Sequence, residues 1–164
     1  MNLIPETIHP TADDLKVIHN LNRLDQCIMR SADYDEYVEL LWDVQNGCLE
    51  RFQLWLTNEG IEEHQDKFAI LAEVYITFIY DYEHIETVTL NSGPGKYFEE
   101  FMVDYLFKKT SMEPEEYALC PASIKLFYEF LYEKGYLLEP PEKMIEFINK
   151  FEPKFIEILR GRFS

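Results

Sequence analysis

Residues 97–138 constrain the fold most strongly, because their apolar side chains recur at the three- and four-residue spacing of an α-helix. Pro114 can begin a short helix, Pro121 suits the first turn of another, and Gly135 is a typical helix cap. One further helix is predicted at residues 96–108, with its apolar face formed by Phe98, Phe101, Met102 and Tyr105. This order of helix, acidic loop, proline and helix predicts an all-α fold.

A long helix is predicted at residues 32–58, although Gly47 lies near its middle. Glycine costs about 1 kcal/mol inside a helix, which would favour a break at this position. The apolar residues nevertheless keep one helical phase on both sides of Gly47, and Gly47 itself falls on the polar side. The phase therefore favours one continuous helix that ends at Gly60 as a left-handed cap.

Two more helices are predicted on either side of this one. Residues 12–29 follow Thr11 and Asp14, which resemble a capping box with Asp in place of Glu. Residues 64–86 are apolar over most of the helical circumference, which is typical of a helix at the centre of a fold. We therefore expect residues 64–86 to be surrounded by the other helices.

The last segment is opened by Pro140 and Pro141 and keeps one apolar helical phase across Pro153. Proline inside a helix removes a backbone hydrogen bond and commonly bends the helix. The pattern predicts either one kinked helix or two consecutive helices that meet near Phe151. In total we expect one domain, residues 1–164, built as a multi-helix bundle of six to eight helices.

Charge is unevenly distributed along the chain, which carries 31 acidic residues and 15 lysines and arginines, a net charge of −16. The acidic N-terminal part, residues 1–90, contains 18 acids and 5 basic residues, whereas residues 91–164, which include the C-terminal helical part at 95–164, contain 13 and 10. A negative field disfavours binding to nucleic acids and anionic membranes and favours basic partners. We therefore expect a basic protein partner and no nucleic acid or membrane.

An acidic stripe is predicted along one face of the helix at residues 32–58, because its polar residues are spaced three or four apart. Arg51 is the only lysine or arginine between residues 33 and 66, so little neutralisation is available within this segment. The stripe predicts a docking surface for a basic partner, and the alternative is an ordinary solvated face. The predicted partner-binding residues are Glu36, Glu39, Asp43 and Glu50, and Asn46 lies in the same stripe.

No catalytic motif is recognisable, and the catalytic residues stay unknown. The densest set of metal-ligand types lies at residues 81–86, with Asp81, Glu83, His84 and Glu86. A di-metal bundle needs a second acid-and-histidine pair from another helix, and the chain lacks one. Residues 92–96 have neither the glycine spacing nor the hydroxyl of a phosphate-binding loop. We therefore predict no metal and no cofactor.

The cysteine count and the hydropathy pattern predict a soluble cytoplasmic protein. Three cysteines without paired spacing favour reduced thiols, and their apolar neighbours favour burial in the core; they are Cys27, Cys48 and Cys120. No apolar run approaches the ~20 residues of a membrane-spanning helix. The first 14 residues lack the basic flank and apolar centre of a secretory signal.

A family resemblance rests on the C-terminal part of the chain. The residues that carry it are Phe98, Phe101 and Leu106, then Cys120-Pro121, Phe127 to Leu131, and Lys134-Gly135. Residues 95–160 resemble a helical domain of uncharacterised bacterial proteins related to plasmid open-reading-frame-three-like and SEC-C-associated proteins. The resemblance implies an all-helical bacterial domain without an assigned activity. Residues 161–164 lack the Cys and His ligands of a SEC-C tail, so it implies no zinc function.

The leading functional hypothesis is a non-enzymatic interaction or accessory protein whose acidic face receives a basic partner. One alternative is a DNA mimic that inhibits a nucleic-acid-binding protein through the same carboxylates. Another is an enzyme or metal-binding bundle whose acids converge from different helices, which sequence spacing does not reveal. Association into a homodimer is a further alternative, because so aromatic a chain can bury surplus apolar surface between two copies.

Overall fold

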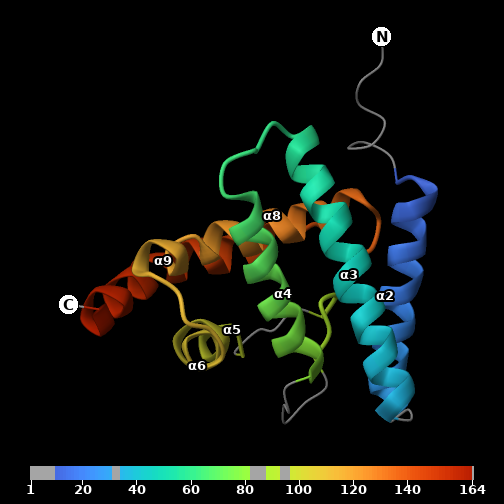
Figure 1. Cartoon of the computed structure of the whole chain (residues 1–164), viewed down its shortest axis with the longest axis horizontal. Coiled ribbons are helices and arrows are strands. Elements are labelled where there is room, and N and C mark those ends of the chain that lie inside the picture. Colours follow the sequence, from blue (N-terminus) through green and yellow to red (C-terminus); the bar gives the residue numbers. More distant parts are fainter. Residues whose placement is uncertain (1–9, 31–33, 82–87, 93–96, 164) are drawn as a thin grey trace.

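The computed structural model describes residues 10–30, 34–81, 88–92 and 97–163. These residues form helices and connectors without a β-strand, which confirms the all-α prediction. None of the described helices is long and apolar enough to cross a membrane. In chain order the helices are α2 (Ala12–Arg30), α3 (Tyr34–Asn58), α4 (Gln65–Asp81), α5 (Tyr97–Glu100), the π-helical turn η1 (Phe101–Tyr105), α6 (Leu106–Lys109), α7 (Pro114–Tyr117), α8 (Cys120–Glu133) and α9 (Glu142–Phe163) (Figure 1).

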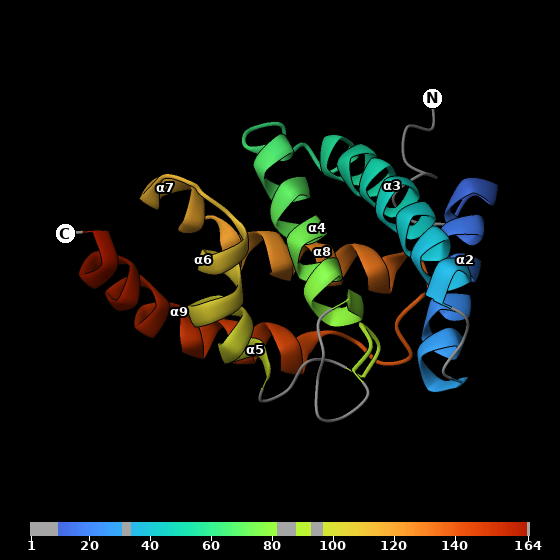
Figure 2. The same cartoon turned by 60° about the horizontal axis from the view of Figure 1, so that its bottom comes forward.

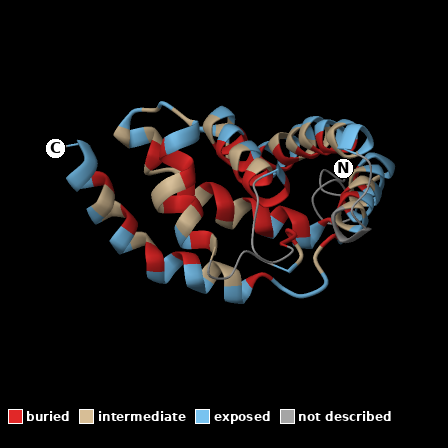
Figure 3. Cartoon of the chain, turned by 90° about the horizontal axis from the view of Figure 1, so that it is seen from below, coloured by how far each residue is buried: buried red, intermediate tan, exposed pale blue. Residues whose placement is uncertain are grey.

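Helix α4 occupies the centre, as its apolar circumference predicts. It packs against α3 on one side and against α8 on the other, while α2 covers the far side of α3 and α9 packs on α8 (Figure 2). Buried residues are concentrated where α4, α8 and residues 97–107 come together (Figure 3). The predicted last turn of α4, residues 82–86, lies outside the described residues.

The ends of α3 and α8 have the same glycine cap. Gly60 has φ +80° and Gly135 has φ +89°, a backbone conformation that glycine adopts without strain. After α3, the Ile61 N–H donates to the Leu56 carbonyl at 2.8 Å, which is the longer hydrogen bond of a Schellman motif. Both glycine caps predicted from the sequence are therefore confirmed.

Helix α3 continues without a break through Gly47, as the apolar phase predicts. The glycine lies against α2: a methyl group placed on its Cα would be 3.4 Å from the Val17 side chain. Helix α2 likewise agrees with the prediction, since it covers residues 12–30. The two helices thus approach closely at Gly47.

Residues 97–109 form one helical segment, but its middle turn is wider than an α-helix. The Leu106 N–H donates to the carbonyl of Phe101, five residues earlier, which defines a π-helical turn. The extra residue in the turn lets side chains on both sides of it face the core. These buried side chains are Phe98, Phe101, Met102, Tyr105, Leu106 and Phe107.

The last segment is a single helix, α9, so the alternative of two consecutive helices is wrong. Pro153 lies inside α9 and is exposed, which keeps its ring away from the packed side. The buried face continues on both sides of this proline. It consists of Ile148, Phe151, Phe155 and Leu159.

Two of the three cysteines belong to the core. Cys48 and Cys120 are fully buried, as predicted, whereas Cys27 is half-buried and packs against the core from α2. Burial raises the pKa of the Cys48 thiol to about 12 and raises the pKa of Cys120 as well. Neither buried thiol is therefore in the reactive thiolate form near neutral pH.

Candidate functional site

The four predicted partner-binding residues lie on the outer face of α3, and all of them are exposed: Glu36, Glu39, Asp43 and Glu50. Arg23 on α2 approaches Glu36, with 3.9 Å between guanidinium nitrogen and carboxylate oxygen. Among the side chains that the structure describes, no basic group comes within 4.0 Å of the other three carboxylates. Among the described side chains, most of the stripe is therefore negative without a paired cation.

Trp42 lies on the same outer face and was missed by sequence reasoning. Its side chain is 63% exposed, which is unusual for the largest aromatic residue. It follows Glu39 by three residues and precedes Asn46 by four, so helical geometry places it beside both. The exposure of Trp42 could have been predicted from the sequence, because Trp42 falls outside the row of apolar positions of α3 and inside the row of polar positions.

A polar groove of about 380 Å³ borders the acidic face, where α2 meets α3. From α3 it is lined by Asp43 and Glu50, and from α2 by Asp13 and Lys16. Arg51 also lines it but is directed toward α2, where it pairs with acids of that helix. The cations near the stripe therefore lie along one edge of it.

Asp14 is a buried carboxylate that joins three helices. It completes the predicted capping box, because its Oδ2 accepts the Thr11 N–H at 2.9 Å and its own N–H donates to Thr11 Oγ1 at 3.2 Å. Its Oδ1 also accepts Arg51 Nε of α3 at 2.9 Å, and its Oδ2 lies 3.3 Å from Lys134 Nζ, just after α8. Asp14 is 2% exposed and Lys134 is 4% exposed. This cluster links α2, α3 and α8 and has a structural role.

Asp25 is a second carboxylate on α2, and it contacts hydroxyl groups instead of cations. Its two oxygens accept hydrogen bonds from the Tyr80 and Tyr136 hydroxyls, each at 2.6 Å. The Tyr80 hydroxyl in turn accepts the Leu90 N–H at 3.1 Å, and the Tyr37 hydroxyl donates to the Tyr80 carbonyl. Burial raises the pKa of Asp25, and the two tyrosine hydrogen bonds offset this only in part.

The residues considered for metal binding are not brought into a cluster that the structure describes. Asp81 is exposed at the end of α4, and residues 82–87 lie outside the described ranges. Among the described residues, no group of three or more His, Cys, Asp or Glu side chains could hold a metal ion. Residues 93–96 of the glycine-rich loop also lie outside them.

Comparisons with known proteins gave no relative for this chain. No protein-family model matches it, and neither the curated proteins nor the solved structures contain a match. The resemblance of residues 95–160 to a bacterial helical domain therefore stays a prediction.

Proposed function

We propose that this chain is a non-enzymatic interaction module that binds a basic segment of a partner protein on the outer face of α3. The observation that carries the proposal is an exposed tryptophan, Trp42, within a row of four carboxylates, three of which have no cation within 4.0 Å among the described side chains. The three free cysteines support a reducing compartment such as the cytoplasm.

The combination of charge and aromatic surface favours a peptide over other basic ligands. Glu39, Asp43 and Glu50 attract lysine and arginine side chains and speed their encounter with the surface. Trp42 offers a π-face on which a guanidinium group can stack, and tryptophan is among the residues that dominate binding energy at interfaces. An arginine-rich segment therefore fits both features.

The same tryptophan disfavours the DNA-mimic alternative. A protein that imitates DNA needs carboxylates at the positions of phosphates, and an indole ring inside that row has no counterpart on a DNA backbone. Competition by duplex DNA for the partner remains a direct test. Strong competition, together with a Trp42→Ala variant of unchanged affinity, would replace the proposed function by DNA mimicry.

The first experiment measures binding of a fluorescent arginine-rich peptide by anisotropy at low and physiological salt. Glu39→Lys combined with Asp43→Lys should weaken binding at least about tenfold, since two attractive charges become repulsive. The matched control, Glu115→Lys with Glu157→Lys, changes the net charge equally at exposed sites on α7 and α9. It should weaken binding much less. Equal losses for both pairs would show a net-charge effect and overturn the proposal.

A second variant removes the exposed indole ring of Trp42 and leaves the net charge unchanged. Trp42→Ala should weaken the same peptide by about fivefold or more, because it removes stacking and apolar contact. The loss should persist at high salt, where exposed charge pairs are screened. Circular dichroism should show unchanged helicity, since Trp42 is largely exposed. Unchanged affinity would show that Trp42 does not contact the peptide and would overturn the proposed binding mode.

A further inference from the structure

We infer a second binding site, independent of α3, in a cavity beside the start of α9, and we propose that it takes an apolar α-amino acid. The cavity has a volume of about 480 Å³, within the range of small-molecule pockets. The described residues that line it come from the connector at residues 88–92, helix α8, the connector at 137–141 and the first turns of α9.

The wall of the cavity is mainly apolar and leaves apolar surface uncovered. Leu90 is fully buried at the inner wall, Met144 is half-buried, and Phe147 is 37% exposed. Leu138 also lines the cavity and is 87% exposed, more than any other large apolar side chain of the described residues. A ligand with an apolar body would cover this surface, and removing it from water favours binding.

Hydrogen bonds hold the wall in place before any ligand binds. The Asn91 side chain donates to the Tyr136 carbonyl at 3.0 Å and accepts the Leu138 N–H at 3.0 Å, which ties the two connectors together. Tyr128 is 2% exposed, and its hydroxyl donates to the Leu90 carbonyl at 3.3 Å. The cavity is therefore preformed, which reduces the ordering cost of binding.

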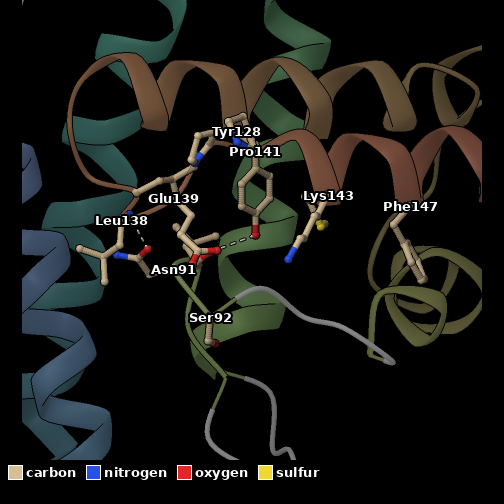
Figure 4. Close-up of a pocket in the computed structure, with 12 residues that line it drawn as sticks. Asn91, Ser92, Tyr128, Leu138, Glu139, Pro141, Lys143 and Phe147 are labelled. Atoms are coloured by element: carbon tan, nitrogen blue, oxygen red, sulfur yellow. Dashed lines mark hydrogen bonds between the residues drawn. The ribbon is translucent and has the colours of Figure 1, made fainter.

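Two opposite charges reach this cavity without pairing with each other. Figure 4 shows Glu139 and Lys143 on opposite sides of the Tyr128 side chain. Both residues are exposed, and no ion pair within 4.0 Å joins their charged groups. A ligand with both an ammonium and a carboxylate group can therefore satisfy both residues at once.

The backbone favours the carboxylate beside Lys143. This residue lies in the first turn of α9, a helix of 22 residues, and Pro141 and Met144 of the same region also line the cavity. The N-terminal end of a helix carries partial positive charge from its free N–H groups. The ammonium group would then lie beside Glu139, and the apolar side chain would contact Met144 and Phe147.

Three probes of similar size test this assignment by calorimetric titration. L-phenylalanine carries both charges, 3-phenylpropanoate lacks the ammonium group, and 2-phenylethylamine lacks the carboxylate. Phenylalanine should bind most tightly, with each of the other two weaker by about fivefold or more, as expected for loss of one charge-assisted hydrogen bond. Glycine, with both charges and no apolar body, should not bind measurably.

Charge-removing variants then assign each contact. Glu139→Gln should abolish the preference for phenylalanine over 3-phenylpropanoate, and Lys143→Gln should abolish its preference over 2-phenylethylamine. The controls Glu157→Gln and Lys150→Gln change charge at exposed sites on α9 outside the cavity lining and should preserve both preferences. Absence of saturable phenylalanine binding at millimolar concentration, or equal binding of all three aromatic probes, would overturn the proposal. Neither result bears on peptide binding to α3.

Discussion

Two carboxylates on helix α2, Asp14 and Asp25, are stabilised in opposite ways. They are 11 residues apart, which is about three helical turns, so both point toward the same side of α2. Asp14 is paired with two cations, Arg51 and Lys134. Asp25 accepts two phenolic hydroxyls, and no cation pairs with it among the described residues. The same chemical group therefore depends on charge at one end of the helix and on neutral donors at the other.

The difference follows from the side chains that neighbouring elements place against each end of α2. Near Asp14, Arg51 of α3 and Lys134 after α8 reach the same carboxylate, and Asp13 also lies 3.9 Å from the Arg51 guanidinium. Near Asp25, the neighbouring elements supply tyrosine hydroxyls from α4 and from the connector after α8. A buried charge that loses its partner costs more than a buried polar group that loses a hydrogen bond. This contrast can be tested by mutation.

The largest effect is expected for Asp14→Asn. It leaves Lys134 buried without an anion among the described residues, and breaking a buried ion pair from one side costs about 3–5 kcal/mol. Urea unfolding should show this loss in the free energy of unfolding. Lys134→Met is the matched control, because Asp14 then keeps Arg51, and it should cost much less. A similar loss for both variants would mean that Lys134, and not the shared anion, holds the cluster together.

Asp25→Asn should cost less, about 1–3 kcal/mol, because no buried charge loses its partner. The amide oxygen can still accept one tyrosine hydroxyl, while the other loses its acceptor. Tyr136→Phe removes one of the two donors and should cost about 1 kcal/mol in the same urea experiment. A loss for Asp25→Asn as large as that for Asp14→Asn would break the contrast between the two carboxylates.

The pH dependence of stability separates the role of Asp25 further. Because burial raises its pKa above 3.8 in the folded state, the folded chain binds this proton at higher pH than the unfolded chain does. The contribution of Asp25 to stability should therefore increase as pH falls from its raised pKa toward 3.8. The measurement is the difference in unfolding free energy between the wild type and Asp25→Asn at several pH values. A difference that shrinks on acidification would show that the tyrosine hydrogen bonds outweigh burial.

The helices and the contact between Thr11 and Asp14 were predictable, because both depend on residues that are close together in the sequence. The capping box joins Thr11 to Asp14 over three residues, and the phase through Gly47 and the cap at Gly60 depend only on neighbouring residues. The exposure of the α3 stripe follows from the same periodicity. Local spacing therefore predicts where a side chain points on its own helix.

Contacts between distant residues were not predictable from spacing. Lys134 is 120 positions from Asp14, and Tyr136 is 111 positions from Asp25, so their meeting depends on how α8 packs. The helical phase of the apolar residues predicts that a tyrosine on that face is buried. It does not predict which group accepts the hydrogen bond from the tyrosine hydroxyl. The wider turn at Phe101 was missed for a related reason, because the packing of both adjacent turns selects it.

The smallest expected effect concerns the contact between α2 and α3 that lies between the two carboxylates. Gly47→Ala should stabilise the chain by about 0.5–1 kcal/mol, because alanine avoids the cost of glycine in a helix. The added methyl group would lie 3.4 Å from the Val17 side chain, an ordinary van der Waals contact. Urea unfolding of wild type and Gly47→Ala measures the gain, and a loss would show that α2 cannot move aside for the methyl group.

The same substitution in the Asp25→Asn background tests whether the two ends of α2 act separately. Val17, which faces Gly47, is eight residues from Asp25, about 12 Å along the helix, a distance at which mutational effects usually add. The gain from Gly47→Ala should therefore be equal in both backgrounds within about 0.5 kcal/mol. A gain that disappears with Asp25→Asn would mean that the tyrosine hydrogen bonds at Asp25 set the spacing of α2 and α3 along its length. The cation-bound and the hydroxyl-bound carboxylate would then belong to one cooperative contact.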